Sequence, residues 1–258
     1  MKKFLAHYQF DPAKKLLLGV ERECHLLDLD GQIKPMAPRV LAGIRERVNG
    51  RSHCYGYELS ACQLEERLAE PSYFGNVSES LDLNEAELKA AEQELGFRRA
   101  FWGAAPAEMP WDVYPDPRYQ AIVANWSRLR LQAACRVTGV HVLVGMPDHG
   151  AALRAYNLAA DNFQTFCRMG DLSGGERLRL FRDHLIDVYD PPIYSDWEEF
   201  YERMRQDGFD QDPRLEWRGI RISTHGAIEF RMFDSTPDKE LIMEWVRVCL
   251  NLCRRALS

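Results

Sequence analysis

The sequence predicts an α+β fold in which helices pack on one face of a sheet and charged side chains line the other face. Three stretches lead to this prediction: residues 16–27, 138–147 and 216–234. In each of them apolar residues alternate with Glu, His or Arg, and alternate side chains of a strand point to opposite faces. Segments with helical periodicity separate the strands and would cover the apolar face.

Length and composition place the chain among ordinary soluble proteins of one domain, here residues 1–258. It is 46% hydrophobic and 28% charged, with a net charge of −6. Lys and Arg are scattered, so a nucleic-acid surface is not expected. No apolar run approaches the roughly 20 residues of a membrane helix. The basic start, Met1–His7, lacks the apolar core of a signal peptide, so we expect a cytoplasmic location. Seven scattered cysteines without metal spacing predict buried, reduced thiols.

The most informative stretch is 216–234, which is typical of two short strands joined by a turn at Gly226. In the second strand Glu229 and Arg231 share one face, opposite an apolar row. Such a pair indicates a sheet that lines a charged cleft. A surface strand with a solvated ion pair is the alternative.

Three further strand regions place acidic or imidazole groups on one face. Glu21 and Glu23 alternate with apolar residues, although Arg22 interrupts that apolar row. Glu58 and Glu65 lie seven residues apart, so the chain has to bend near Ser60 to bring both to the same face. Taken alone, Glu58 and Glu65 are more simply interpreted as solvated, and a half-exposed strand with acidic outer positions is the alternative for Glu21 and Glu23.

His141 lies on one face of the strand 138–147, beside Gly139 and Gly145. A lone histidine among apolar residues is commonly a core residue. Glycines in a strand, however, leave room for a ligand or another backbone to approach. The two interpretations stay open at this point.

Helical periodicity and capping residues predict seven helices. They cover residues 35–50 (ended by Asn49-Gly50), 76–95, 119–136, 150–168, 176–188, about 195–208 and a last helix from Asp238. In the third of these, a stripe is predicted to be core: Ile122, Trp126, Leu129 and Ala133. Residues 104–118 are proline-rich and predicted to form a loop.

Together the polar faces would form one acidic and imidazole set: Glu21, Glu23, Glu58, Glu65, His141 and Glu229. Carboxylates gathered in a cleft repel one another unless they are protonated or neutralised, and a divalent cation is the natural remedy. Oxygen ligands with one imidazole suit Mg²⁺ or Mn²⁺ better than zinc. Phosphoryl-transfer sites are commonly built in this way. The sequence has no Walker-type loop, so arginines and metal ions would have to bind the phosphates of ATP.

The order of four motifs resembles the glutamate–cysteine ligase family, in its bacterial carboxylate–amine ligase branch with a glutamine-synthetase-like fold. The motifs are Gly19–Glu23, Gln63–Glu65, Gly139–Gly145 and Ile228–Asp234. Residues 116–120 and 217–221 also resemble segments of this family. The resemblance spans roughly residues 16–237. It implies a curved antiparallel sheet shaped as a funnel, which binds ATP and two or three Mg²⁺ (or Mn²⁺) ions.

The resemblance also implies a role for each residue. Metal ligands would be Glu21 and Glu23 as a pair, Glu65 as a bridging carboxylate with Glu58 beside it, and His141 with Glu229 for a further ion. Arg231 matches the arginine that faces the phosphoryl group, and Arg221 would be a second partner of phosphate or carboxylate. Two departures stand out. Leu143 stands where this branch of the family usually has a second histidine. Longer members of the family continue well past the strand that holds Glu229 and Arg231, whereas this chain ends one helix later, at Ser258, and this affects the wall of the nucleotide site.

The function implied is an ATP-dependent ligase. It would form an amide between the γ-carboxylate of glutamate, or of a similar acid, and an amino acid or amine through an acyl phosphate. One alternative is a relative that binds metal and nucleotide without ligating. A second is a metal-dependent hydrolase. A homodimer is also compatible, since a partner could complete the funnel.

Overall fold

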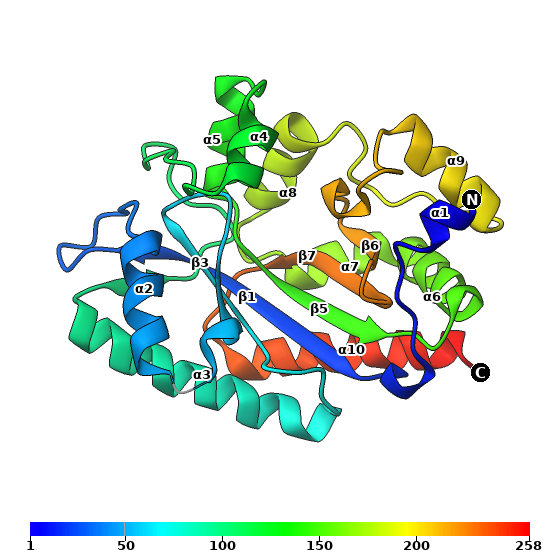
Figure 1. Ribbon diagram of the computed structural model, residues 1–258, viewed down its shortest axis with the longest axis horizontal. Coiled ribbons are helices and arrows are strands. Elements are labelled where there is room, and N and C mark those ends of the chain that lie inside the picture. Colours follow the sequence, from blue (N-terminus) through cyan, green and yellow to red (C-terminus); the bar gives the residue numbers. More distant parts are fainter. Residues whose placement is uncertain (49) are drawn as a thin grey trace.

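The computed structural model describes residues 1–48 and 50–258. Its sheet has seven strands in the order β2-β3-β1-β5-β7-β6, with β4 beside the end of β1, and each neighbouring pair is antiparallel (Figure 1). The strands are β1 Leu18–Leu27, β2 Tyr55–Tyr57, β3 Gln63–Arg67, β4 Arg98–Ala100, β5 Gly139–Gly145, β6 Ile220–Ser223 and β7 Ala227–Asp234. The predicted α+β fold with an antiparallel sheet is therefore confirmed.

Helices pack on one face of this sheet and surround the rim of the other. They are α1 Lys2–Leu5, α2 Ala37–Arg47, α3 Phe74–Leu95, α4 Pro117–Val123, α5 Arg128–Arg136, α6 His149–Asp161, α7 Phe163–Gly170, α8 Glu176–Leu180, α9 Trp197–Gln206 and α10 Lys239–Ala256. Short turns of other helix types are η1 Pro12–Lys14, η2 Ser52–Cys54, η3 Phe181–Leu185 and η4 Pro213–Leu215. Helices α3, α6, α7 and α10 contact the apolar face of the strands. No helix in the described part of the chain is both long and apolar enough to cross a bilayer.

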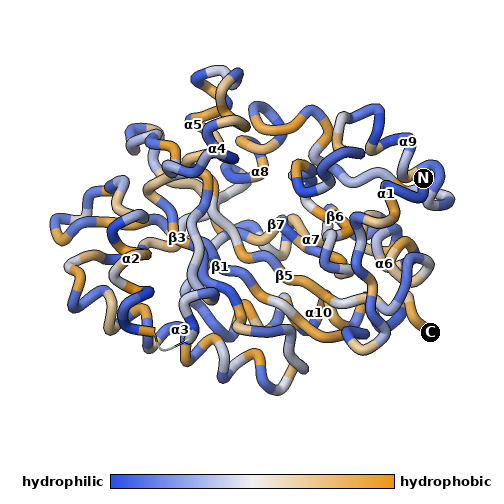
Figure 2. The backbone as a smooth tube through the Cα atoms, viewed as in Figure 1, coloured by the Kyte–Doolittle hydropathy of each residue, from blue (hydrophilic) through white to orange (hydrophobic). Residues whose placement is uncertain are grey.

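The core lies between the apolar face of the sheet and α10, where hydrophobic residues gather along β5, β7 and α10 (Figure 2). Trp245 of α10 stacks on Phe233 of β7, with ring centroids 4.8 Å apart. Arg22, which interrupts the apolar row of β1, is buried in ion pairs with Glu66 and Glu85. A buried guanidinium needs such partners, because an unpaired charge away from water is costly.

The predicted helix over 119–136 is wrong: two helices, α4 and α5, occupy this stretch. The Ser127 hydroxyl accepts a hydrogen bond from the Arg130 amide (3.2 Å), which caps a new helix. The predicted core stripe is also wrong, because Leu129 is 60% exposed and only Ala133 is buried. Local capping decided the break, and helical spacing did not reveal it.

Three other predicted helices differ from the structure, one because it is interrupted and two because they end earlier. The predicted helix over 150–168 is interrupted at Asn162, whose side chain donates to the Leu158 carbonyl (2.8 Å). The predicted helix over 176–188 ends at Leu185. Helix α2 ends at Arg47, and Asn49 of its predicted stop lies outside the described residues.

The β6–β7 turn depends on glycine, and this can be tested by stability. Gly226 has φ +79°, and a Cβ there would lie 2.4 Å from the backbone oxygen of Gln9. Gly31 has φ +81° with nothing within 4 Å of such a Cβ. We expect Gly31→Ala to lower the free energy of unfolding by about 1–2 kcal/mol, and Gly226→Ala by about 1–3 kcal/mol more, because it adds a backbone clash. Urea denaturation measures both, and equal losses would contradict the role of the Gln9 contact.

Candidate active site

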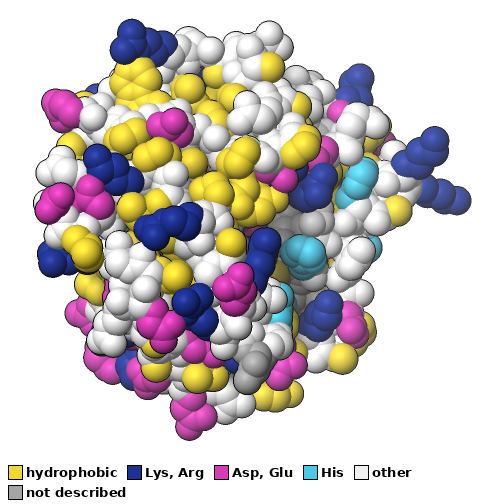
Figure 3. Space-filling view, turned by 60° about the vertical axis from the view of Figure 1, so that its left-hand side comes forward, with side chains coloured by type: hydrophobic (Ala, Val, Ile, Leu, Met, Phe, Trp, Pro, Cys, Tyr) yellow, Lys and Arg dark blue, Asp and Glu magenta, His cyan; other side chains and the backbone are white. Residues whose placement is uncertain are grey.

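The polar face of the sheet forms the floor of a cleft with a volume of about 420 Å³. Helices α4, α5 and α8 and the segment before β6 contribute its walls. The space-filling view shows a hollow in this side of the molecule with basic and histidine side chains at its border (Figure 3). The cleft is lined by all eight residues that the sequence predicted for the site: Glu21, Glu23, Glu58, Glu65, His141, Arg221, Glu229 and Arg231.

Glu21, His141 and Glu229 form the first acidic group. Glu21 pairs directly with His141 across β1 and β5, and Glu229 follows on the next strand, β7. Each offers a ligand atom within 4.8 Å of the others. His141 Nδ1 lies 3.2 Å from a Glu21 carboxylate oxygen. The pairing register of three adjacent strands thus creates a set of ligands that one cation could occupy.

Glu23, Glu58 and Glu65 form the second acidic group, again with ligand atoms within 4.8 Å of one another. Glu23 pairs with Glu65 across β1 and β3. Glu58 joins them because the chain turns between β2 and β3, where the Gln63 amide donates to the Ser60 carbonyl (3.1 Å). The predicted bend near Ser60 is confirmed.

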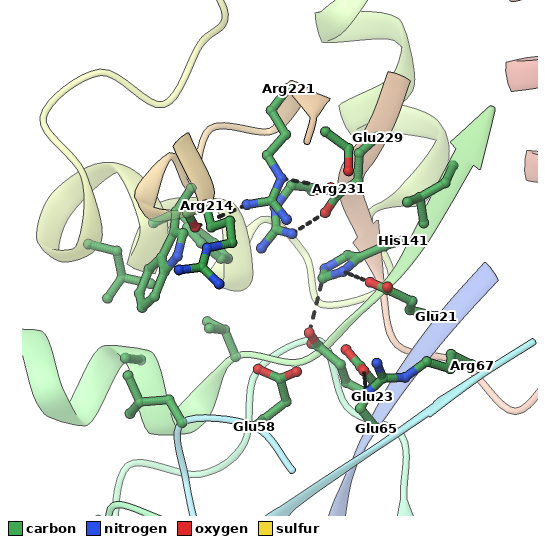
Figure 4. A pocket seen from close by; sticks show the side chains of 18 of the residues that line it. Glu21, Glu23, Glu58, Glu65, Arg67, His141, Arg214, Arg221, Glu229 and Arg231 are labelled. Atoms are coloured by element: carbon green, nitrogen blue, oxygen red, sulfur yellow. Dashed lines mark hydrogen bonds and ion pairs between the residues drawn. The ribbon is translucent and has the colours of Figure 1, made fainter. Parts of the chain in front are cut away.

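His141 belongs to the first group and also reaches the second (Figure 4). Its Nε2 is 3.5 Å from a Glu23 oxygen, while Nδ1 faces Glu21. His25, two residues after Glu23 on β1, is buried and has a ring nitrogen 3.3 Å from the Cys135 carbonyl. Burial lowers the pKa of His25 to about 4, so it is a neutral core histidine.

Two carboxylates of the second group have raised pKa values. Burial, followed by repulsion from Glu23, raises the pKa of Glu58 to about 7. Burial and the neighbouring carboxylates of Glu21 and Glu58 likewise raise the pKa of Glu65. In both cases burial is the larger cause and neighbouring carboxylates add to it. A set of carboxylate oxygens in need of positive charge fits Mg²⁺ or Mn²⁺.

Glu229 shows the opposite behaviour. Burial opposes its ionisation, yet Arg221 and Arg231 outweigh burial and hold its pKa well below the usual range. Arg221 Nε donates to one oxygen of Glu229 (2.7 Å), and Arg231 Nη1 donates to the other. Backbone carbonyls of Arg214 and Glu216 also accept from Arg221 (3.2 and 3.0 Å). Glu229 therefore fixes two guanidinium groups next to the metal-ligand candidates (Figure 4).

A β-bulge in β7 lies opposite His141. Val140 pairs with Phe233 and Val142 with Phe230, so two residues of β7, Arg231 and Met232, oppose one residue of β5. Bulges re-aim the side chains next to them. Here Arg231 faces the cleft, while Met232 is buried in the core.

Arg177 of α8 is a cleft residue that the sequence analysis missed. It is 1% exposed, and one Nη donates to the Arg231 carbonyl (3.0 Å). Its other Nη and its Nε have no partner among the described residues. A Cβ on Gly139 would lie 2.4 Å from this guanidinium, so the guanidinium has room here only because residue 139 has no side chain. The glycine in the strand was the one available signal, since it indicated the close approach of some group.

A buried guanidinium without a carboxylate partner calls for an anion. Arg177 is one of six arginines that line the cleft: Arg67, Arg118, Arg177, Arg214, Arg221 and Arg231. Arg67 is engaged by Glu65 (2.8 Å) and Arg221 and Arg231 by Glu229. The cleft thus combines acidic groups suited to cations with arginines suited to phosphate or carboxylate.

Sequence comparisons confirm the resemblance to the glutamate–cysteine ligase family. The chain is 26% identical over 249 residues to "Putative glutamate–cysteine ligase 2" of Thermobifida fusca (strain YX), which covers 89% of this chain and 61% of that protein. It is 31% identical over 144 residues to a protein of the same name from Salinispora arenicola (strain CNS-205), or 55% of this chain and 37% of that protein. The chain therefore spans less than two thirds of the length of these relatives. No protein-family model matches it.

A solved structure shares the fold. The chain superposes on the crystal structure of a bifunctional glutathione synthetase from Pasteurella multocida with a TM-score of 0.63, over 99% of this chain and 41% of that chain. The two are 14% identical in sequence. At this identity the likeness establishes the fold of the chain and does not identify its substrates.

Proposed function

From its likeness to the glutamate–cysteine ligase family, we propose that this chain carries the catalytic site of an ATP-dependent carboxylate–amine ligase. It would join the γ-carboxylate of glutamate, or of a similar acid, to an amino acid or amine. The observation that carries the proposal is the single cleft in which two three-residue metal-ligand groups lie beside arginines. Such a combination suits the transfer of a phosphoryl group between anionic partners.

The acidic groups would hold two or three Mg²⁺ or Mn²⁺ ions, which offset the charges of ATP and of the acid when they are bound. Glu21, His141 and Glu229 would supply one set of ligands, and Glu23, Glu58 and Glu65 the other. Arg231 and Arg221, held in place by Glu229, would donate hydrogen bonds to the phosphoryl oxygens. Donors fixed before the reaction require no reorganisation during it.

The reaction would proceed in two displacements. A carboxylate oxygen of the acid attacks the γ-phosphorus of ATP, and the bond to the β-phosphate oxygen breaks, which releases ADP. The amine nitrogen then attacks the carbonyl carbon of the acyl phosphate. The carbon–oxygen bond breaks, inorganic phosphate leaves, and the nitrogen loses a proton. The protein contributes positioning and charge neutralisation and forms no covalent intermediate.

A direct test measures ADP release by the purified chain with Mg²⁺, ATP, glutamate and a panel of amino acids and amines. The proposal expects release that requires both the acid and an amine, with an amide detected by mass spectrometry. A chain that hydrolyses amides without ATP would instead be a hydrolase. Absence of amine-dependent release across the panel would contradict the proposal.

Arg177 should bind the second charged group of the acid. Its contact with the Arg231 carbonyl places it next to the arginine that would face the phosphoryl group transferred to the acid. A hydrogen bond to a charged group contributes about 1.5–3 kcal/mol, so Arg177→Met should raise the KM for glutamate roughly 10- to 100-fold. Steady-state kinetics measures this. Arg179→Met, on the same helix but 54% exposed, is the matched control. Equal effects of the two variants would contradict the assignment.

A further inference from the structure

A second cavity, of about 500 Å³, lies beside the cleft and has no part in the mechanism above. We name it the tryptophan pocket. It is lined by Ile122, Trp126, Arg130, Ile186, Asp187, Val188, Gln206, Asp207, Phe209, Leu215, Trp217 and Arg218. Ligand-binding pockets commonly have volumes of about 300–1,000 Å³.

The tryptophan pocket and the cleft share their walls. Three segments contribute residues to both: 117–137, 181–188 and 213–218. In the last two segments the earlier residues line the cleft and the later ones line the pocket. Trp217 itself borders the two spaces. Trp217 would therefore be in reach of a molecule in either space.

The pocket offers apolar surface and, among the described residues that line it, one cation without an ion pair. Trp126 and Trp217 meet edge to face with centroids 5.5 Å apart. The guanidinium of Arg130 lies over the ring of Trp126 at 4.5 Å, and its Nε is buried without a partner among the described residues. Arg218, by contrast, is engaged by Asp207 and Glu216.

We infer that the tryptophan pocket binds the acceptor, and that the acceptor is an amino acid with a bulky apolar side chain. The side chain would pack against the tryptophans and aliphatic residues, and its carboxylate would bind Arg130. The volume is far larger than the side chain of cysteine needs. The six arginines of the cleft offer more positive charge to the triphosphate of ATP than the pocket does, where Arg218 is already engaged by Asp207 and Glu216. This inference rests on the proposed function, because only a ligase would have an acceptor.

Calorimetric titration tests the binding with L-phenylalanine and with glycine as probes. It is done on the full chain, with and without Mg²⁺, glutamate and a non-hydrolysable ATP analogue. Burying a large apolar side chain should make phenylalanine bind at least about tenfold more tightly than glycine. Val188 is 40% exposed at the pocket, so Val188→Trp should fill the pocket without disturbing the core and weaken phenylalanine at least about tenfold. Ile193→Trp, at a site 57% exposed and outside the pocket, should change nothing.

A second variant tests the carboxylate. Arg130→Gln should remove the preference of the pocket for phenylalanine over phenylalaninamide, which has no carboxylate, while phenylalaninamide itself binds as before. An unchanged preference would overturn the role of Arg130. Equal binding of phenylalanine and glycine, or phenylalanine binding insensitive to Val188→Trp, would overturn the pocket.

The nucleotide is the competing occupant. If Val188→Trp weakens the ATP analogue instead of phenylalanine, the pocket binds the adenine and the inference fails. Failure of the proposed function gives a different result: phenylalanine would bind in the pocket, yet it would stimulate no ADP release. ADP release with other amines, together with no binding of phenylalanine, would leave the ligase and remove the inference.

Discussion

Arg231→Met is expected to lower kcat of the proposed ligase reaction about a thousandfold. Removal of one fixed donor from a charge-stabilising site costs roughly 10²–10³ in kcat, and arginines that stabilise a phosphoryl transition state contribute roughly 10³–10⁵. Arg231 is mostly buried, is held by Glu229 and faces the cleft. Burial opposes its charge, but Glu229 and the nearby carboxylates raise its pKa, so it stays cationic.

Arg231→Lys should restore part of kcat, because an ammonium keeps the charge but loses the planar fork that matches a phosphoryl group. Arg205→Met, at a side chain 57% exposed on α9, is the control for a lost surface arginine. Single-turnover kinetics separates chemistry from product release. A kcat within about threefold of the parent, with the change confined to KM, would show that Arg231 binds substrate without stabilising the transition state.

Glu21→Gln is expected to weaken Mn²⁺ binding by roughly a thousandfold. At 4 Å and an effective dielectric constant of 20, one unit charge contributes about 4 kcal/mol to the interaction with another, which corresponds to roughly that factor. The amide has nearly the same shape and can still meet His141, which lies 3.2 Å away. Calorimetry at pH 8, above the pKa of about 7 of Glu58, keeps Glu58 mostly ionised during the titration.

Glu70→Gln is the matched control, since Glu70 is exposed and lies outside the cleft. The thermal unfolding midpoint of each variant without metal checks that the fold is retained. If Glu21→Gln and Glu70→Gln bind Mn²⁺ equally well, Glu21 is not a metal ligand.

The strands and their polar faces could be predicted because a period of two is a local property. Glu21, His141 and Glu229 each stand opposite an apolar row, and antiparallel pairing of neighbouring strands brings such faces together. Glu58 and Glu65 needed one more inference, the bend near Ser60, which their odd spacing required. The order of the four motifs supplied the roles, which local patterns alone leave open.

What the sequence left out depends on contacts between distant segments. Nothing in the run Arg177-Leu178-Arg179 distinguishes the buried arginine from the exposed one, because the difference arises where α8 packs over Gly139. Ile122 and Trp126 have the spacing of core residues, yet they line the tryptophan pocket. A hydrophobic period shows that a face is covered or enclosed and does not show whether protein or ligand covers it.

The hydrogen bond from Arg177 to the Arg231 carbonyl joins two cleft cations through the main chain. This bond holds the Arg177 guanidinium against the main chain of β7, and Glu229 holds the Arg231 guanidinium, so each cation has a fixed partner. If the proposed function holds, the two arginines would bind the two charged groups of the acid at a set distance. An acid shorter or longer by one methylene would reach only one of them, so the site would select its substrate by chain length.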